Sequence, residues 1–172
     1  GELFNVGLRQ GVAEVLNQRG LPALAPMLHP AWSWQTSPQY SFASNWSERH
    51  AAHAAGLGTF GLCDGLITPA GKAVRVGSVI TRAPLAVTPR PYQGIHDYCL
   101  FFSHGTCGKC VPRCPVKALG DQGHNKEKCH RHVNQVCREY VKKNFDIETD
   151  CCGLCQTAVP CSDHIPAPEE GL

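Results

Sequence analysis

The sequence predicts an α+β fold in two parts, and three features of the chain support this prediction. Residues 1–91 alternate helical and strand-like apolar patterns and contain a single cysteine. Ten of the eleven cysteines lie between Cys99 and Cys161. A proline-rich linker at residues 84–91 separates these two compositions. We therefore expect an α+β domain over residues 1–91 and a cysteine-rich module over residues 92–172.

The composition limits the classes of function that fit this chain. Among 172 residues, 13 prolines and 17 glycines indicate a loop-rich protein, as expected where backbone wraps a metal centre. The formal net charge is only +2 and the longest basic run is Lys142-Lys143, so the sequence has no nucleic-acid footprint. Apolar runs are far shorter than the roughly twenty residues that span a bilayer, so no membrane segment is expected.

The first predicted element is a helix over residues 2–19. Apolar side chains recur there at near-helical spacing, and Gly20 is expected to occupy the position that follows the helix end. Residues 21–27 contain two prolines and are expected to be extended.

A second helix is predicted to begin at Asn45, whose side chain would cap it, with Glu48 completing a capping box. This helix would end at Gly56, and residues 74–81 would form a strand. The glycine-rich segment 56–61 follows a helix rather than a strand, which argues against a phosphate-binding loop. We expect a tight turn there that brings the backbone close to another element or to a flat cofactor.

The strongest functional signal is the segment CGKCVPRCP. Cys107, Cys110 and Cys114 have the spacing C-x2-C-x3-C and are followed by Pro115. This is the last part of the bacterial ferredoxin run, in which thiolates from one tight loop hold an iron–sulfur cluster and the fourth ligand reaches a second cluster. Pro115 is expected to start a short helix. The chain is therefore predicted to bind iron–sulfur clusters and to move electrons.

Two other interpretations of the cysteines explain less of the pattern. A zinc site could use two C-x2-C pairs, Cys107/Cys110 and Cys152/Cys155, but it leaves the Cys-Pro step and the other cysteines of the module unexplained. A disulfide scaffold is typically shorter and has an even number of cysteines. Iron–sulfur thiolates predict a reducing compartment, most simply the cytoplasm.

Two four-iron (4Fe-4S) clusters require eight ligands. In ferredoxins the fourth cysteine of each sequence motif binds the other cluster, and the same rule divides the cysteines of this chain into two groups. The first cysteine group comprises Cys99, Cys107, Cys110 and Cys161. The second cysteine group comprises Cys114, Cys129, Cys152 and Cys155. The ferredoxin spacing would place a ligand at position 104, so His104 competes with Cys99 for the first group. Thiolate is the commoner ligand, which favours Cys99.

Three cysteines remain outside these groups. Cys137 lies on a helix predicted over residues 126–143 and is expected to be a small buried apolar residue. Cys151 is set aside because C-x2-C spacing selects its neighbour. Cys63 lies outside the module; core packing is favoured over a position that faces a cofactor, and both stay open.

The order of these motifs resembles one family. The segment NWSERHAAHAAGLGTFGLCDGLIT is followed by GSVIT, the Cys-Pro loop and a late Lys-Cys and Cys-x2-Cys pattern. In this combination, residues 45–166 resemble epoxyqueuosine reductases and reductive dehalogenases, especially their uncharacterised iron–sulfur relatives.

The resemblance implies a nitroreductase-like α+β half that holds cobalamin, followed by a ferredoxin-like module with two 4Fe-4S clusters. It also implies that Glu48, Arg49, Gly56, Gly58 and Gly61 frame a turn that faces the cofactor, and it supports the eight-cysteine assignment. The expected partners are an electron donor of the ferredoxin or flavodoxin type and a small-molecule or modified-nucleoside substrate.

Two departures from the family pattern concern proton transfer. The proton-donor aspartate expected before the Glu-Arg pair is replaced by Phe42, and a lysine expected after the second glycine turn is replaced by Leu62. No catalytic acid is therefore assigned. The first hypothesis is an iron–sulfur reductase of the corrinoid type that lacks this proton donor. The second is a non-catalytic, ferredoxin-type electron carrier or electron-transfer subunit.

Overall fold

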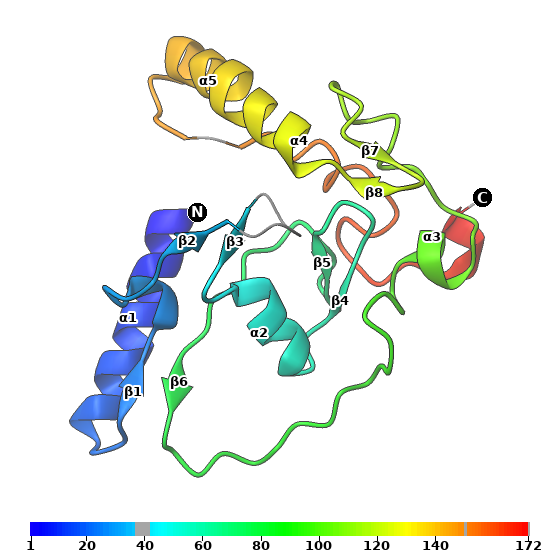
Figure 1. Ribbon diagram of the computed structural model, residues 1–172. Helices are drawn as coiled ribbons and strands as arrows, with labels where there is room; N and C mark the ends of the chain where they lie inside the picture. Colours follow the sequence, from blue (N-terminus) through cyan, green and yellow to red (C-terminus); the bar gives the residue numbers. More distant parts are fainter. Residues whose placement is uncertain (37–41, 150, 172) are drawn as a thin grey trace. The chain divides into compact units, whose positions relative to one another are not determined.

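The computed structural model describes residues 1–36, 42–149 and 151–171. In this part of the chain, helices accompany two-stranded antiparallel sheets (Figure 1), which confirms the predicted α+β class. Two compact units are described separately: the first unit comprises Gly1–Gly58 and Val74–Ile95, and the second unit comprises Thr59–Ala73 and His96–Leu172. None of the helices in the described ranges is both long and apolar enough to cross a membrane.

The first unit begins with helix α1, Glu2–Gln18, as the apolar spacing predicts. The helix ends where Gly20 adopts a left-handed backbone conformation (φ +72°). The Gly20 amide donates to the Asn17 carbonyl, and the Leu21 amide donates to the Leu16 carbonyl at 3.0 Å. The glycine that the sequence places after the helix therefore satisfies the last carbonyl groups of α1.

Two short antiparallel sheets belong to the first unit. β1 (Ala23–Leu24) pairs with β6 (Ile80–Thr81), and β2 (Trp34–Gln35) pairs with β3 (Ala43–Ser44). The extended backbone predicted over residues 21–27 ends early, because the 3-10 helix η1 begins at its second proline and spans Pro26–Leu28.

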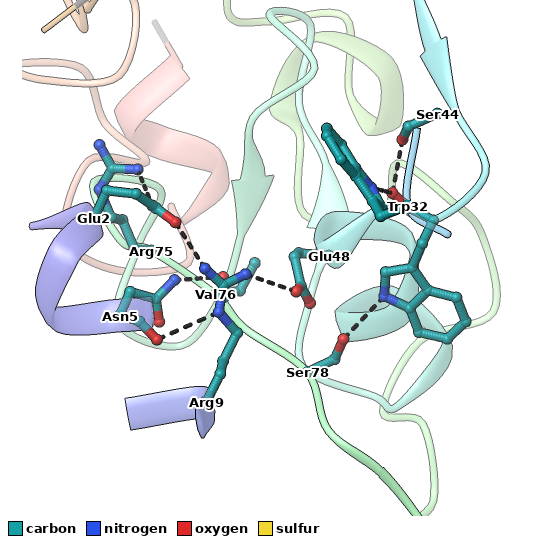
Figure 2. A network of polar contacts seen from close by, with 10 residues as sticks. Glu2, Asn5, Arg9, Trp32, Ser44, Glu48, Arg75, Val76 and Ser78 are labelled. Carbon is teal, nitrogen blue, oxygen red and sulfur yellow. Dashed lines mark hydrogen bonds and ion pairs between the residues drawn. The ribbon is translucent and has the colours of Figure 1, made fainter. Parts of the chain in front are cut away.

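The strand predicted over residues 74–81 is wrong in extent, because only its last two residues pair in a sheet. The earlier residues direct their polar groups to side chains instead. Asn5 Nδ2 donates to the Val76 carbonyl at 3.1 Å, and Trp46 Nε1 donates to Ser78 Oγ at 3.0 Å (Figure 2). The apolar alternation of this segment gives no information about a partner strand.

Helix α2, Glu48–Ala54, begins later than predicted. Ser47 is its N-cap, and Ser47 Oγ accepts a hydrogen bond from the His50 amide. The predicted cap at Asn45 is wrong because that side chain is used elsewhere: Asn45 Nδ2 donates to the Ala31 carbonyl at 2.7 Å.

A polar network joins α1, α2 and the segment before β6 (Figure 2). The Arg9 guanidinium, 4% exposed, donates to Glu48 Oε1 at 2.9 Å and to Glu2 Oε1 at 2.7 Å. Arg75 Nη1 donates to the other Glu2 oxygen at 2.8 Å. The carboxylate of Glu48 thus pairs with Arg9 and does not complete the predicted capping box.

The second unit contains two further antiparallel pairs, β4 (Thr59–Phe60) with β5 (Leu66–Ile67) and β7 (Leu119–Gly120) with β8 (Gly123–His124). Helix α3 spans Leu100–Ser103 and contacts the 3-10 helix η3, Pro168–Gly171. The core of this unit mixes aliphatic side chains with thiols: Leu62, Cys63, Ile67, Cys99, Cys110, Leu119 and Val159.

One continuous helix carries the middle of the cysteine-rich module. It consists of α4 (Lys126–His132), a π-helical turn η2 (Val133–Cys137) and α5 (Arg138–Phe145). Asn125 caps it by accepting a hydrogen bond from the Lys128 amide at 3.0 Å. The helix predicted over residues 126–143 is confirmed, and the π-helical turn is an addition that apolar spacing does not reveal.

The short helix predicted to start at Pro115 does not form, because the chain makes a single turn there. The Lys117 amide donates to the Cys114 carbonyl at 3.1 Å, and Lys117 then adopts a left-handed backbone conformation (φ +51°). This conformation redirects the chain into β7 before a helix can continue.

Candidate metal centre

The first cysteine group borders one pocket in the second unit. Cys99, Cys107, Cys110 and Cys161 all line it together with Lys72, and the rest of the wall is mostly apolar. Cys99 and Cys110 are each 8% exposed, whereas the other two cysteines are half-buried. Thiols from three separate stretches of the chain therefore meet at one partly enclosed space.

Local backbone hydrogen bonds hold two of these stretches. Cys99 is the N-cap residue of α3, and its carbonyl accepts a hydrogen bond from the Ser103 amide at 2.9 Å. The Val111 amide donates to the Gly108 carbonyl at 2.8 Å and closes the turn that carries Cys110. Short-range turns thus set the positions of the thiols that sequence spacing singled out.

Cys161 reaches the pocket because its segment is clamped against residues 71–73. The Lys72 amide donates to the Cys161 carbonyl at 2.8 Å. Gly71 makes this approach possible: its φ is +76°, and a Cβ atom at this position would lie 2.3 Å from the Asp163 Cα. Only glycine combines this backbone conformation with this close a contact.

Lys72 places a buried positive charge beside the pocket. The residue is 3% exposed, and it lines the pocket together with Cys110 and Cys161. Burial alone would lower the pKa of Lys72, but the neighbouring Cys63, Cys161 and Cys110 thiolates raise it above its ordinary value. Burial in turn raises the pKa of the Cys110 thiol to about 12.

Three members of the second cysteine group are linked to one another or to the core. Cys114 Sγ accepts a hydrogen bond from the Ala118 amide at 3.1 Å, and Cys114 and Cys155 both pack against the apolar core. Cys129 lies on α4, where burial and then the nearby Cys114 and Cys152 thiols raise its pKa. All four cysteines of the group therefore lie in the second unit.

Cys63 is a neighbour of this second group although it lies far away in sequence. It is 4% exposed, and its Sγ lies 3.8 Å from the Cys155 carbonyl oxygen. A hydrogen bond with the Cys155 thiol, assisted by the charge of Lys72, lowers the pKa of Cys63 to about 5. Cys63 is thus a core residue, which confirms one of the two interpretations made from the sequence. That it faces a cofactor stays a prediction.

The loop that carries Cys63 is anchored to the start of the long helix. Asp64, which has a left-handed backbone conformation (φ +57°), lies 3.0 Å from His124 Nδ1 and 3.7 Å from Lys126 Nζ. This anchor holds the β4–β5 turn next to the helix on which Cys129 lies.

Cys152 has a second set of neighbours on that helix. Its Sγ, His132 Nε2 and Cys137 Sγ all lie within 4.8 Å of one another. The π-helical turn η2 lies between His132 and Cys137, and its wider winding brings residues five apart into register. Such a trio could hold one zinc ion if a fourth ligand joined it. The expectation that Cys137 is buried is wrong, because it is only half-buried.

His104 and Cys151 lie outside both groups. His104 is exposed, its Nδ1 lies 2.8 Å from Ser103 Oγ, and it is absent from the lining of the pocket that contains Cys99. Cys151 is exposed. Of the two candidates for the eighth ligand, the structure thus places Cys99 at the pocket wall.

Two of the glycines expected to face a flat cofactor lie in the first unit and contact its own residues. Gly56 has φ +86°, and a Cβ atom there would lie 3.4 Å from the Pro89 carbonyl oxygen. The Gly58 amide donates to Tyr92 Oη at 3.4 Å. These contacts agree with the tight-turn interpretation of the glycine-rich segment.

Two further residues that were expected to face the cofactor are Gly61 and Arg49. Gly61 belongs to the second unit, where a Cβ atom would lie 3.4 Å from Ile67 Cδ1. Arg49 is exposed on α2. The contacts of these residues therefore do not by themselves fit a corrinoid, and we derive no step that involves one.

Comparison with known proteins gives one distant relationship. The chain is 32% identical over 119 residues to the epoxyqueuosine reductase of Bacillus anthracis. The aligned region covers 66% of this chain but only 29% of that reductase, so the chain spans under a third of the length of this relative. No protein-family model matches the chain, and no solved structure matches it.

Lys72 is the residue of this site that the sequence did not single out. Lysine is among the residues least often buried, so a lone lysine in TPAGKAV is expected to lie in solvent. The one available signal is the preceding Gly71, because a glycine outside a predicted turn can mark a close approach of backbone.

Proposed function

We propose that this chain is the electron-transferring part of an iron–sulfur oxidoreductase that carries two 4Fe-4S clusters. The main support is the single pocket bordered by Cys99, Cys107, Cys110 and Cys161, because sequence spacing had grouped these cysteines independently of any structure. A ferredoxin-type loop joined by one distant cysteine is a common donor set for a cubane cluster. Cys114, Cys129, Cys152 and Cys155 would hold the second cluster.

The spacing of the first cysteine group suits a cluster better than a single metal ion. Among the described residues, no three ligand atoms of this group lie within 4.8 Å of one another. Tetrahedral zinc, with Zn–S bonds of about 2.3 Å, would need sulfur atoms about 3.8 Å apart. A four-iron core keeps its cysteine ligands farther apart, since each thiolate binds a different iron.

The residues of the second unit would hold, shield and orient the clusters. When bound, such a cluster accepts and donates one electron at a time. The apolar side chains of Leu62 and Val159 would keep water from the first cysteine group, and the Ala118 amide already points at Cys114 Sγ. Electrons would come from an external donor of the ferredoxin or flavodoxin type.

The substrate side of the proposal comes from the similarity to an epoxyqueuosine reductase. We propose a small-molecule or modified-nucleoside substrate, a nitroreductase-like half over residues 1–91 and a ferredoxin-like module over residues 92–172. Cobalamin is the electron acceptor that this similarity suggests, and its binding is a question for experiment because the glycine-rich segment contacts the chain itself.

A non-catalytic electron carrier or subunit is the alternative, and two side chains favour it. Phe42 and Leu62 stand where a proton donor and a lysine were expected, and Leu62 is 3% exposed within the core. Neither side chain can transfer a proton, so a complete reductase would need an acid from elsewhere.

Anaerobic reconstitution with iron and sulfide, with and without cobalamin, tests the proposal. We expect about eight irons and eight sulfides per chain, as two four-iron clusters require. A corrinoid that stays bound through gel filtration would support the reductase, whereas two clusters without a corrinoid would support the carrier. Stoichiometric zinc in place of iron would overturn both.

A pair of cysteine variants tests the ligand assignment where the structure offers a competing site. C152S should lose about half of the iron, because one of two clusters is then incomplete, while C137S should keep all of it. Equal loss of metal from both variants would instead assign the metal to the His132, Cys137 and Cys152 trio.

A further inference from the structure

We propose that Lys72 sets the reduction potential of the cluster at the first cysteine group by supplying a fixed, buried positive charge. This inference rests on the proposed function, since it assigns a role to Lys72 only if that group holds a cluster. Lys72 would be a tuning residue, because it lines the pocket beside the candidate ligand cysteines and is not itself a ligand to iron.

The first argument is the burial of Lys72 and the way its position is fixed. The side chain is 3% exposed and lines the same pocket as Cys110 and Cys161. Its Cδ and Cγ atoms pass directly over Gly65, where a Cβ atom would lie 2.7 and 2.8 Å from them. Its backbone is held by hydrogen bonds from its amide to the carbonyls of Cys161 (2.8 Å) and Ser162 (3.1 Å).

The second argument is the kind of partner that this ammonium group has. Among the residues that the structure describes, no carboxylate forms an ion pair with Lys72 within 4.0 Å. The pocket that Lys72 lines contains four thiols, those of Cys99, Cys107, Cys110 and Cys161, and no carboxylate. A buried charge requires a compensating charge nearby, and here only thiolates can supply it.

These two observations determine the direction of the effect. Reduction of a cluster adds one electron and no proton, so the cluster and its four thiolates become more negative by one charge. A positive charge held in a poorly solvated site stabilises that reduced state more than the oxidised state. Lys72 should therefore raise the reduction potential of the first cluster, and its removal should make that cluster harder to reduce.

The experiment is an EPR-monitored redox titration of the reconstituted chain and three variants. K72M removes the charge and keeps the length of the side chain, K72R keeps the charge, and K109M removes an exposed charge next to Cys110. We expect K72M to shift the midpoint potential of one cluster to lower values, with the other cluster shifted less. K72R and K109M should stay close to the wild type, because solvent screens the charge of Lys109.

Iron content separates failure of this inference from failure of the proposed function. A wild-type chain that takes up no iron refutes the proposed function. A K72M variant with full iron and unchanged potentials overturns the role of Lys72 while leaving the clusters in place.

A measurement on the wild-type chain covers the case in which K72M does not retain iron. Chain labelled with lysine that carries 15N only at Nζ is reduced and examined by pulsed EPR. We expect a 15N coupling to the cluster signal that K109M retains and K72R loses, since arginine removes the labelled atom. A wild-type spectrum without this coupling overturns the inference.

Discussion

The two units of this chain bury different kinds of groups. In the first unit, α1 buries Arg9 and Ala13, while apolar residues on other faces such as Leu3 and Phe4 are 89% and 76% exposed. In the second unit, the hydrophobic core consists of aliphatic side chains and thiols. Ion pairs that involve α1 therefore organise the first unit, whereas cysteines and the residues that position them organise the second.

This difference gives the units different expected sources of stability. Regular hydrogen bonds within α1 and α2 and the Arg9–Glu48 pair depend on no metal. Apart from the long helix over residues 126–145, the second unit has short secondary structure around its cysteines. Loop-rich modules of this kind gain much of their folding free energy from the metal they bind. Removal of metal should therefore destabilise the second unit and leave the stability of the first unit unchanged.

The largest expected effect is the loss of protection in the second unit when iron is absent. Hydrogen exchange of the iron-free chain should show fast exchange around Cys110, Leu119 and Val159, and unchanged protection in α1. The physical reason is that unpaired buried thiols cannot replace iron–thiolate bonds. Equal protection of both units with and without iron would contradict this account of the second unit.

The next largest effect concerns the clamp at Cys161. G71A should destabilise the second unit by about 2–5 kcal/mol, because it adds backbone strain and a collision with the Asp163 backbone. Denaturant unfolding followed by the cluster absorbance measures this loss. G123A is the matched control, since Gly123 has φ +96° but an added Cβ atom would meet nothing within 4 Å, so it should cost only about 1–2 kcal/mol of strain. If G71A and G123A lost equal amounts of unfolding free energy, the close contact of Gly71 with the Asp163 backbone would not stabilise the second unit.

The Arg9–Glu48 pair tests the first unit. R9M leaves the buried Glu48 carboxylate without its partner and should cost about 3–5 kcal/mol of unfolding free energy. The double variant R9M/E48M should recover most of that loss, since it removes both buried charges. R75Q removes an ion pair that is about half exposed and should cost only about 0–1 kcal/mol. A double variant as unstable as R9M would show that Arg9 acts through packing instead of charge.

The smallest effect is a pH response near the end of the chain. Hydrogen bonds from His164 to Glu170 and Asp163 raise the pKa of His164, and the Ala167 amide followed by His164 lowers the pKa of Glu170. The His164 contribution to stability is present at low pH and is lost as the pH rises through its raised pKa. The Glu170 contribution is lost as the pH falls through its lowered pKa. Histidine NMR titration of the oxidised chain should show the raised pKa, and E170Q should bring it back toward the ordinary value.

Much of the fold followed from local signals in the sequence. The apolar spacing and Gly20 defined α1, and the amphipathic pattern over residues 126–143 defined the long helix. Errors occurred where a side chain had a more distant partner. Asn45 bonds to Ala31 and so does not cap α2, and this contact depends on a turn that periodicity cannot identify.

The candidate site was predictable to the extent that cysteine spacing determines it. The turn chemistry around Cys107 and Cys110 is local, so spacing placed these residues in one predicted ligand group, and both line the same pocket. The position of Lys72 was not predictable, because it depends on Gly71 and on a pairing with residues about ninety positions later in the sequence. The cluster of His132 with Cys137 was missed because it needs a π-helical turn.

The most direct test of the central claim is spin quantification of the fully reduced, reconstituted chain by low-temperature EPR. The account predicts two spins per chain, one from each 4Fe-4S cluster, with line broadening from their mutual interaction. C161S should leave one spin without that broadening, because it removes a ligand of the first cysteine group only. A single spin in the wild type, or two spins that C161S does not change, would contradict the division of the eight cysteines into two clusters.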